Sequence, residues 1–435
     1  MRKVIVNTDI YDYHAYQKDM YVVFDRKIEK VGRMADYVRE EGTEEINGKG
    51  MLLMPGHIIG HSHIYSAFSK GICLQPFAPR TFTERLRQFW WKLDKEYDLD
   101  ACYQSARVCG IDYLKSGITT VFDHHAGGYI QGSLNAIKAG IVDELGIRAM
   151  MAFETSDRFD VDACIRENVD FAQSNRSEMC RGMFGMHASL SLSENTLAAV
   201  AEARNGIPIH VHCGESMEEE YESINKYGMR AAERYAAHGL LDEDGLLAHC
   251  TNIDEREADV IREHGTVVAV NPTANLNSNN GIPDLGLMKN KGLNVIVGTD
   301  AMDSNIANEY NNLFYITQYK LNDRTTRKYT KSDLLKSIRY VYEYAGRLLG
   351  VKLGRIEAGY ESDMLLIPYH ISTVVDESNI FSYITGSVYR RFVPKAVFVR
   401  GEWKVRDYVT VFDEEEIYKA SRESCKKTWE RVAES

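Results

Sequence analysis

His61 and His63 are the residues whose types and spacing most directly suggest chemistry. They stand two positions apart, just after an apolar run over residues 51–59 that has the character of a β-strand. Residues i and i+2 of a strand lie on the same side, so both imidazole rings can face one point beside the strand's carboxyl end. Because imidazole is a common metal ligand, the pair indicates part of a metal site.

Polar side chains also follow three later apolar runs, and these are His212, His249 and Asp300. In a parallel barrel the carboxyl ends of the strands meet at one mouth, so residues far apart in sequence come together there. A catalytic metal needs several protein ligands and one position left for water, and it lowers the pKa of that water towards ~7. We therefore predict a metal-dependent hydrolase whose single divalent ion is bound by His61, His63, His212 and Asp300.

Three residues are predicted to act on the reaction itself. Glu215 lies three residues after His212, where it can move a proton onto a ring or leaving-group nitrogen. Such general acid–base assistance is typically worth ~10²–10⁴ in rate. We expect His249 to contact the attacking water or to polarise the substrate. Asp300 can accept the proton of that water while it binds the metal.

Composition limits the classes of partner. The chain has 435 residues and a formal net charge of −11, which argues against nucleic acid and anionic membranes, because both favour basic patches. No apolar stretch is long enough to span a bilayer, and the amino terminus turns polar too early for a signal peptide. The eight cysteines include no Cys-x-x-Cys pair, as expected of reduced thiols. We expect a cytoplasmic protein with a small-molecule substrate.

Eight apolar runs alternate with segments of helical periodicity, at the spacing of βα units. The runs cover residues 51–59, 118–122, 147–153, 183–186, 207–211, 245–248, 266–270 and 293–297. This rhythm predicts an α/β protein built as a (β/α)8 TIM-like barrel. The long excursion after the first run, residues 64–117, is either a lid over the site or ordinary packing.

Short strand-like segments gather at both ends of the chain. We expect residues 1–50 and 355–412 to form one small β-domain, because both stretches flank the βα core. Residues 51–354 are predicted to form the barrel, and residues 413–435 a charged amphipathic helix. A chain of this length accommodates one large domain and a smaller one.

Taken together, these motifs resemble the amidohydrolase superfamily, in its branch of cytosine and guanine deaminases and triazine chlorohydrolases. The resemblance runs over nearly the whole chain and is carried by residues 55–63, 117–120, 212–215, 271–275, 298–300 and 359–363. A closer resemblance is to the SsnA-type aminohydrolases, carried by residues 122–126, 154–158 and 427–431.

This resemblance implies a barrel flanked by a small β-sandwich, a homodimer, and one Zn²⁺ or Fe²⁺ ion. Relatives with two metals use a carbamylated lysine at the fourth strand, whereas residues 185–187 here contain none, which favours a single ion. Histidines at strand ends are also more often structural than functional. With that alternative in view, we expect five residues to contact the substrate: His124, His125, Glu154, His187 and Asn275.

Three functions remain open at this point. The leading one is deamination of a purine- or pyrimidine-like nitrogen heterocycle. A second is hydrolysis of a cyclic amide or of another leaving group such as chloride. A third is a non-catalytic metal-binding scaffold, which would be expected to have lost a ligand or the acid, whereas the complete set is present.

Overall fold

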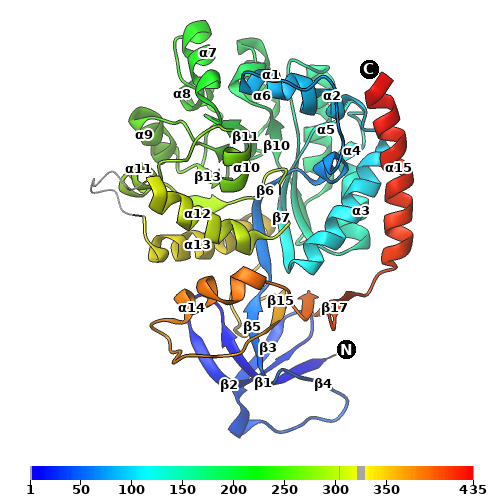
Figure 1. Cartoon of the computed structure of the whole chain (residues 1–435), viewed down its shortest axis with the longest axis vertical. Coiled ribbons are helices and arrows are strands. Elements are labelled where there is room, and N and C mark those ends of the chain that lie inside the picture. The colour runs from blue at the N-terminus through cyan, green and yellow to red at the C-terminus, as the bar shows by residue number, and fades with distance from the viewer. Residues whose placement is uncertain (1, 303, 321–328, 435) are drawn as a thin grey trace.

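The computed structural model describes residues 2–302, 304–320 and 329–434. Figure 1 shows two parts: a large body of parallel strands surrounded by helices, and below it a β-rich part that contains the amino terminus. The carboxyl-terminal helix runs back along the side of the large body.

The β-rich part is a nine-stranded sheet that draws on both ends of the chain. Its order is β18-β17-β16-β15-β5-β1-β2-β3, and β4 pairs with β1. The first five strands in sequence are β1 (Lys3–Tyr11), β2 (Tyr16–Phe24), β3 (Ile28–Arg33), β4 (Glu44–Asn47) and β5 (Met51–Pro55). The other four are β15 (Met364–Pro368), β16 (Ala396–Val399), β17 (Glu402–Arg406) and β18 (Val409–Thr410).

The large body contains two parallel sheets, as expected for an α/β protein. One has the order β6 (His57–Ser62), β7 (Ile118–His125), β8 (Arg148–Phe153) and β9 (Cys180–Gly182). The other is β10 (Phe184–Met186), β11 (Ile209–Cys213), β12 (Leu246–His249), β13 (Val267–Val270) and β14 (Val295–Val297). Isolated parallel bridges, Ser62–Asp300 and Thr155–Met186, connect the two sheets near their carboxyl ends. Because of these bridges, side chains from both sheets face a common space.

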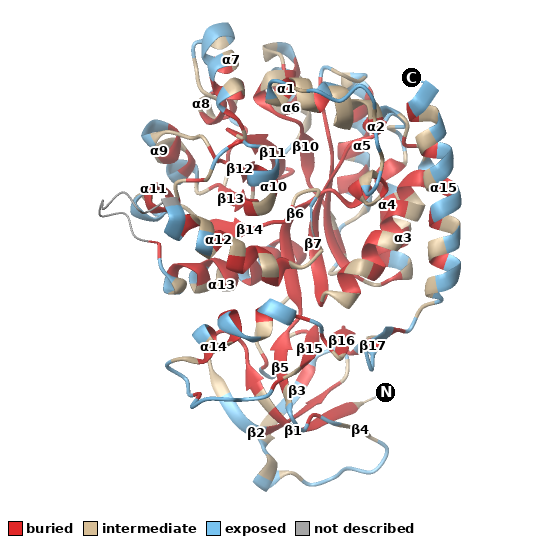
Figure 2. Cartoon of the chain, viewed as in Figure 1, coloured by how far each residue is buried: buried red, intermediate tan, exposed pale blue. Residues whose placement is uncertain are grey.

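Helices cover the outside of the parallel strands, and Figure 2 shows buried residues on their inner faces and exposed residues on their outer faces. They are α3 (Leu99–Lys115), α4 (Ser133–Lys138), α5 (Val161–Ser174), α6 (Glu194–Ala203), α7 (Met217–Tyr227), α8 (Ala231–Ala237), α9 (Glu255–His264), α10 (Pro272–Asn277), α11 (Leu285–Lys291), α12 (Ile306–Lys320) and α13 (Lys331–Leu349). Two more, α14 (Ile380–Gly386) and α15 (Glu414–Glu434), follow β15 and β18. Several begin at a capping side chain, such as Asp98 before α3, which satisfies a free backbone N–H of the first turn.

The excursion between β6 and β7 is helical and lies at the carboxyl end of the strands. It contains a 3₁₀ segment (Ile64–Ser69), α1 (Phe82–Arg85), a π-helical turn (Leu86–Trp90) and α2 (Trp91–Lys95) before α3. The carboxyl-terminal helix holds it in place, because Trp429 Nε1 donates a hydrogen bond of 2.8 Å to the Phe68 carbonyl.

The apolar run over residues 51–59 differs from the prediction, because it forms two strands rather than one. The strand β5 pairs with β15 in the nine-stranded sheet, with Met54 opposite Leu365. The strand β6 begins after Gly56, where a Cβ atom would lie 2.3 Å from the Thr119 side chain. A continuous apolar pattern does not reveal this change of sheet, because both strands are buried.

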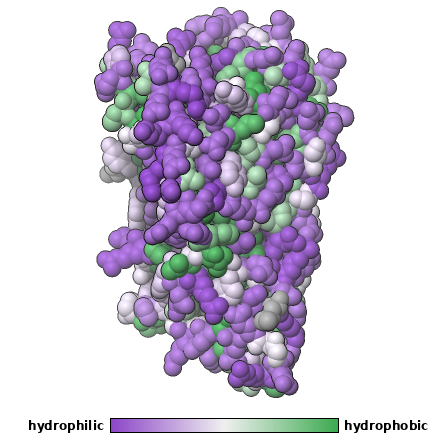
Figure 3. All heavy atoms as spheres, turned by 90° about the vertical axis from the view of Figure 1, so that its right-hand side faces the viewer, coloured by the Kyte–Doolittle hydropathy of each residue, from purple (hydrophilic) through white to green (hydrophobic). Residues whose placement is uncertain are grey.

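Among the described residues, none of the helices combines the length and the apolar character needed to cross a membrane. Figure 3 shows that hydrophilic residues cover most of the face on which α15 lies, with smaller hydrophobic areas between them.

Candidate metal centre and active-site pocket

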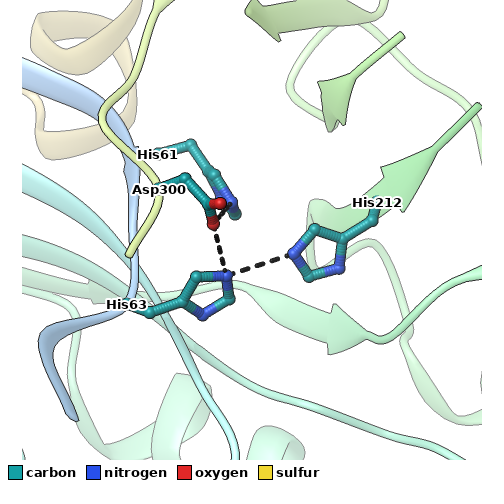
Figure 4. Close-up of side chains that lie close together, drawn as sticks. All are labelled: His61, His63, His212 and Asp300. Carbon is teal, nitrogen blue, oxygen red and sulfur yellow. Dashed lines mark hydrogen bonds and ion pairs between the residues drawn. The ribbon is translucent and has the colours of Figure 1, made fainter. Parts of the chain in front are cut away.

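The four predicted metal ligands lie together at the carboxyl ends of the strands (Figure 4). One ligand atom from each of His61, His63, His212 and Asp300 can be chosen so that all lie within 4.8 Å of one another. His61 belongs to β6, His63 directly follows it, and His212 belongs to β11. Asp300 lies three residues after β14.

The contacts within this group are short and converge on His63. Its Nε2 atom lies 3.0 Å from Asp300 Oδ1 and 3.3 Å from His212 Nε2. The Nε2 atom of His61 lies 3.5 Å from the same carboxylate oxygen and makes no hydrogen bond within the described part of the chain. All three imidazoles are buried.

Hydrogen bonds behind the group fix which ring nitrogen faces it. His63 Nδ1 lies 2.6 Å from the backbone carbonyl of His124, and His212 Nδ1 lies 2.6 Å from that of His187. A carbonyl only accepts, so Nδ1 carries a proton in both rings, and Nε2 is the nitrogen that faces the group. His61 Nδ1 is similarly engaged, at 2.8 Å from His210 Nε2.

This donor set fits a divalent cation. His63 Nε2 lies 3.0 Å from Asp300 Oδ1 and 3.3 Å from His212 Nε2, and ligand atoms this close together suit a site that holds a positive charge. Tetrahedral ligands at about 2.1 Å from a Zn²⁺ ion would be about 3.4 Å apart. Burial favours the neutral form of Asp300, but its contacts with His61 and His63 outweigh burial and hold its pKa well below the usual range. The carboxylate is therefore ionised, as a ligand must be.

Two functional residues have left-handed backbone conformations. His249 has φ 74° and Asp300 has φ 54°, a region that costs most residues free energy and often marks functional sites. Backbone hydrogen bonds hold Asp300 there, because its N–H donates to the His61 carbonyl at 3.1 Å. The strand end thereby turns sharply and directs the carboxylate back towards the histidines.

Glu215 lies beside the metal group and has the properties of a general acid. Burial and the nearby charge of Asp300 raise its pKa well above the usual range. Asn280 Nδ2 donates to its Oε1 at 3.1 Å, while Oε2 lies 3.8 Å from His249 Nε2. The protonated form of this carboxyl group is therefore favoured, and it can present a proton to a bound molecule.

Asn275 holds His249 on the far side of its ring. The Nδ1 atom of His249 lies 2.8 Å from Asn275 Oδ1. Since Asn275 Nδ2 donates to Thr251, its oxygen faces the histidine and accepts from Nδ1. His249 thus directs Nε2 at the same space as Glu215.

A cavity opens directly over the metal group. Its floor contains His63, His212, Glu215, His249 and Asp300, and its walls include Tyr65, Asp94, Glu154, His187 and Ser278. The excursion after β6 covers it with Phe82, Leu86, Trp90 and Trp91. Two roles were open for this segment, a lid over the site or ordinary packing. Its residues form the roof of the pocket, which is the first of these roles.

The structure separates the five residues predicted to contact substrate into two sets. Glu154 and His187 line the cavity, whereas His124, His125 and Asn275 are not among its lining residues. His124 lies behind the wall, 3.0 Å from the Met186 carbonyl, and His125 turns outward to Cys102 of α3. Consecutive strand residues point to opposite sides, so His124 and His125 cannot both face the mouth.

Sequence reasoning missed four residues that contribute to this site. Asn280 lies in a connecting segment, Asp94 lies in the short helix α2, and Arg158 follows β8 by five residues. No periodic pattern there predicts the direction of a side chain. His210 belongs to β11, and its Nε2 contacts His61 of the metal group. Its spacing of two from His212 was a usable signal, since both lie on one side of β11.

The profile of the Amidohydrolase family matches residues 52–404, a span that contains the whole metal group. The chain belongs to the amidohydrolase family. This confirms the resemblance carried by the sequence motifs. A curated relative of this amidohydrolase, a 5′-deoxyadenosine deaminase of Methanopyrus kandleri, is 29% identical over 402 residues and is matched over 88% of each chain.

Solved structures share the fold. An adenosine deaminase from Xanthomonas campestris with bound zinc aligns with a TM-score of 0.83 and 17% identity, covering 98% of both chains. A guanine deaminase from C. acetobutylicum with guanine in its active site aligns with a TM-score of 0.77 and 18% identity, covering 93% of this chain and all of that one.

Proposed function

We propose that this amidohydrolase hydrolytically deaminates a nitrogen heterocycle, replacing an amino group on a ring carbon by oxygen from water and releasing ammonia. The observation that carries the proposal is the pairing of two features in one cavity. Four side chains suited to a divalent cation lie beside a buried glutamate whose pKa is raised well above its usual range. The names of the relatives, adenosine-type deaminases, point in the same direction.

The four ligands are proposed to bind one Zn²⁺ ion, with Fe²⁺ as the alternative, because imidazole and carboxylate suit both. When bound, such an ion supplies a Lewis acid that makes water nucleophilic near neutral pH. The protein's contribution is to orient three Nε2 atoms towards one point through the hydrogen bonds on their Nδ1 sides.

Protons are moved by Glu215 and Asp300. Glu215 protonates a ring nitrogen next to the carbon under attack, and Asn280 keeps Oε1 in position for this. Asp300, ionised because of its histidine neighbours, accepts a proton from the attacking water. His249, fixed by Asn275, stabilises the oxygen that remains on the carbon. The proton held by Asp300 then passes to the amino group, the C–N bond breaks to release ammonia, and the proton of the new hydroxyl group returns to Glu215.

We further propose that the two parallel sheets represent one closed (β/α)8 barrel and that the terminal strands form a β-sandwich. The bridges at Ser62–Asp300 and Thr155–Met186 support the barrel, as does the short gap between β9 and β10, which are separated by Met183 alone. The homodimer, the cytoplasmic location and the closer relationship to SsnA-type aminohydrolases stay predictions from sequence.

Purified protein loaded with zinc should release ammonia from at least one member of a panel of aminopurines, aminopyrimidines and their nucleosides. Product mass should rise by the difference between an NH unit and an oxygen atom, because the second hydrogen of the amino-bearing ring stays on a ring nitrogen. Ring opening without ammonia would instead support cyclic-amide hydrolysis. Release of chloride from chlorotriazines as the sole activity would support the dehalogenation alternative.

A further inference from the structure

The carboxyl group of Glu219 is buried close to Glu215, and the proposed reaction does not use it. Glu219 belongs to the first turn of α7 and has no exposed surface. Burial raises the pKa of Glu219 to about 8, and the charges of Glu215 and Glu257 add to this shift. Burying a carboxyl group beside two other acids costs free energy, and hydrogen bonds from two loops of the site offset part of that cost.

Both of these hydrogen bonds come from backbone N–H groups. The Glu215 N–H donates to Glu219 Oε2 at 3.0 Å, and the Ser189 N–H donates to Oε1 at 3.1 Å. The first loop follows β11 and carries the proposed general acid. The second follows β10 and begins with His187, whose side chain lines the cavity. One carboxyl group therefore sets the separation between the acid and the wall that contains His187.

The Ser189 end of this connection is fixed by further contacts. Arg234 of α8 donates from Nη1 to the Ser189 hydroxyl at 2.7 Å and to its carbonyl at 3.1 Å. The same hydroxyl donates to Ser223 of α7 at 3.1 Å. Ser189 is thus attached to two helices outside the strands, and Glu219 connects Glu215 to this fixed point.

The Glu215 end is held at three points. Glu219 accepts its N–H, Asn252 Nδ2 donates to its backbone carbonyl at 2.9 Å, and Asn280 Nδ2 donates to its Oε1 at 3.1 Å. The other carboxyl oxygen, Oε2, lies 3.8 Å from His249 Nε2. A general acid must lie within hydrogen-bond reach of the atom that it protonates, so a small displacement of Glu215 weakens its action.

We propose that Glu219 is a positioning residue for the general acid: its carboxyl group accepts from both loops and thereby fixes Glu215 relative to the wall that contains His187. This inference rests on the proposed deamination, in which Glu215 protonates the ring. Glu219 is not among the residues that line the cavity, so it acts through the backbone of Glu215. Its loss should slow the chemical step and leave substrate binding and the metal group intact.

Two substitutions remove the hydrogen bonds in steps. Glu219→Gln keeps the size of the side chain but has a single acceptor oxygen, so in either orientation of the amide one of the two N–H groups loses its partner. Glu219→Met keeps the length and has no acceptor oxygen. Glu220→Gln is the matched control, because Glu220 is the next residue, is equally buried, and accepts instead from the Ala231 N–H of α8 at 3.2 Å.

Amide hydrogen exchange tests the connection without depending on turnover. Zinc-loaded proteins are transferred to deuterium oxide, and exchange is read by mass spectrometry at single-residue resolution. In Glu219→Gln the amide of Glu215 or of Ser189 should exchange at least about tenfold faster, and in Glu219→Met both should, because each loses a hydrogen bond. Glu220→Gln should change neither. Native exchange rates at both amides in the folded Glu219 variants would overturn the inference.

Kinetics test the effect on the acid, with the panel compound that the native protein deaminates fastest as substrate. Glu219→Gln should lower kcat at least about tenfold and change KM less than about threefold, with zinc content unchanged. In protein that already carries Glu215→Gln, the same substitution should lower kcat less than about threefold, because the acid through which it acts is gone. An equal loss in both backgrounds, or in Glu220→Gln, would show a structural role only and refute the proposal.

Zinc content and melting temperature identify variants that do not fold, and either Glu219 variant is sufficient for the exchange measurement. Failure of both to fold, beside a folded Glu220→Gln, would show that Glu219 stabilises the fold rather than the acid, against the inference. No ammonia from any compound would instead contradict the proposed deamination, and hydrogen exchange would then decide by itself whether Glu219 positions Glu215.

Discussion

At the scale of single residues, the site depends on which atom of each side chain carries a proton. The carbonyls behind His63 and His212 place a proton on Nδ1 of each ring, so Nε2 is the nitrogen that faces the metal group. Burial and the nearby charge of Asp300 raise the pKa of Glu215 well above its usual range. Nitrogen ligands thus face one point, and a carboxyl group that favours its protonated form lies beside it.

Glu215→Gln should reduce ammonia release by ~10²-fold or more, because glutamine fills the same volume but donates no proton to the ring. Zinc content should be unchanged, since Glu215 is outside the four-residue metal group. Steady-state kinetics and metal analysis of the same sample test this. Glu202→Gln, on the exposed face of α6, should match the native protein. Native turnover in Glu215→Gln would remove this residue from the mechanism.

At the scale of elements, close approaches between strand ends position the ligands. Gly298, just after β14, lies so near β6 that a Cβ atom would be 2.4 Å from Asn271 Oδ1 and 2.7 Å from the His61 carbonyl oxygen. The absence of a side chain there lets the loop with Asp300 reach His61 and His63.

Gly298→Ala should therefore displace the strand that carries His61, lowering zinc affinity and destabilising the fold by ~1–3 kcal/mol, the usual cost of overpacking. Zinc titration and urea unfolding measure the two effects. Gly386→Ala is the control, because a Cβ atom there has no neighbour within 4 Å. Equal zinc affinity in the two variants would show that this close approach does not position the ligands.

The helices α7, α8 and α9 share a buried acidic cluster that predicts a pH effect on stability. Burial, with the nearby charges of Glu257 and Glu219, raises the pKa of Glu220 from its ordinary 4.5 to about 9. The folded state therefore holds this proton more tightly than the unfolded chain. Its contribution to stability is complete below about pH 4.5 and is lost as the pH rises towards 9.

Glu220→Gln should remove the share of the pH dependence that comes from Glu220, because the amide does not ionise. Glu219, whose pKa is raised to about 8, still titrates in the variant. Urea unfolding at pH 5, 7 and 9 should show the variant gaining stability relative to the native protein as the pH rises. If the difference in unfolding free energy between the two proteins is the same at all three pH values, Glu220 is not a source of the pH dependence.

Much of the site was predictable, because four functional positions end or follow a recognisable apolar run. His61, His212 and His249 belong to strands, and Asp300 follows β14 closely. The alternation of side chains along a strand, and the meeting of parallel strands at their carboxyl ends, were therefore sufficient to predict that these residues lie together. The family resemblance supplied Glu154 and His187 as pocket residues. Asp94 and Asn280 could not be placed, because their positions depend on how segments without periodicity fold back over the mouth.

At the scale of the whole molecule, a buried ionic group joins the parallel strands to the nine-stranded sheet. Arg148 of β8 is fully buried, with Nε 2.7 Å from Asp363 Oδ2 and Nη2 2.6 Å from Glu361 Oε2. Asp363 directly precedes β15, and Glu361 lies three residues before that strand. The arginine thus connects the body that contains the candidate metal centre to a sheet formed from both chain ends.

Arg148→Met should destabilise the protein by ~3–5 kcal/mol, because it leaves two buried carboxylates without their partner. Lys426→Met provides the contrast, since Lys426 and Glu430 form an exposed pair 3.8 Å apart on α15 and such pairs contribute ~0–1 kcal/mol. Thermal and urea unfolding of both variants test the difference. Similar losses of stability in the two variants would mean that the buried ionic group around Arg148 does not hold the two parts of the molecule together.

The most direct test is to add Zn²⁺ in steps to metal-depleted protein, measuring bound metal and ammonia release in each sample. Both should rise together and saturate at about one ion per chain, and His212→Ala should abolish both. Full activity in protein stripped of metal, or in His212→Ala, would contradict the assignment of these four side chains as the catalytic metal site.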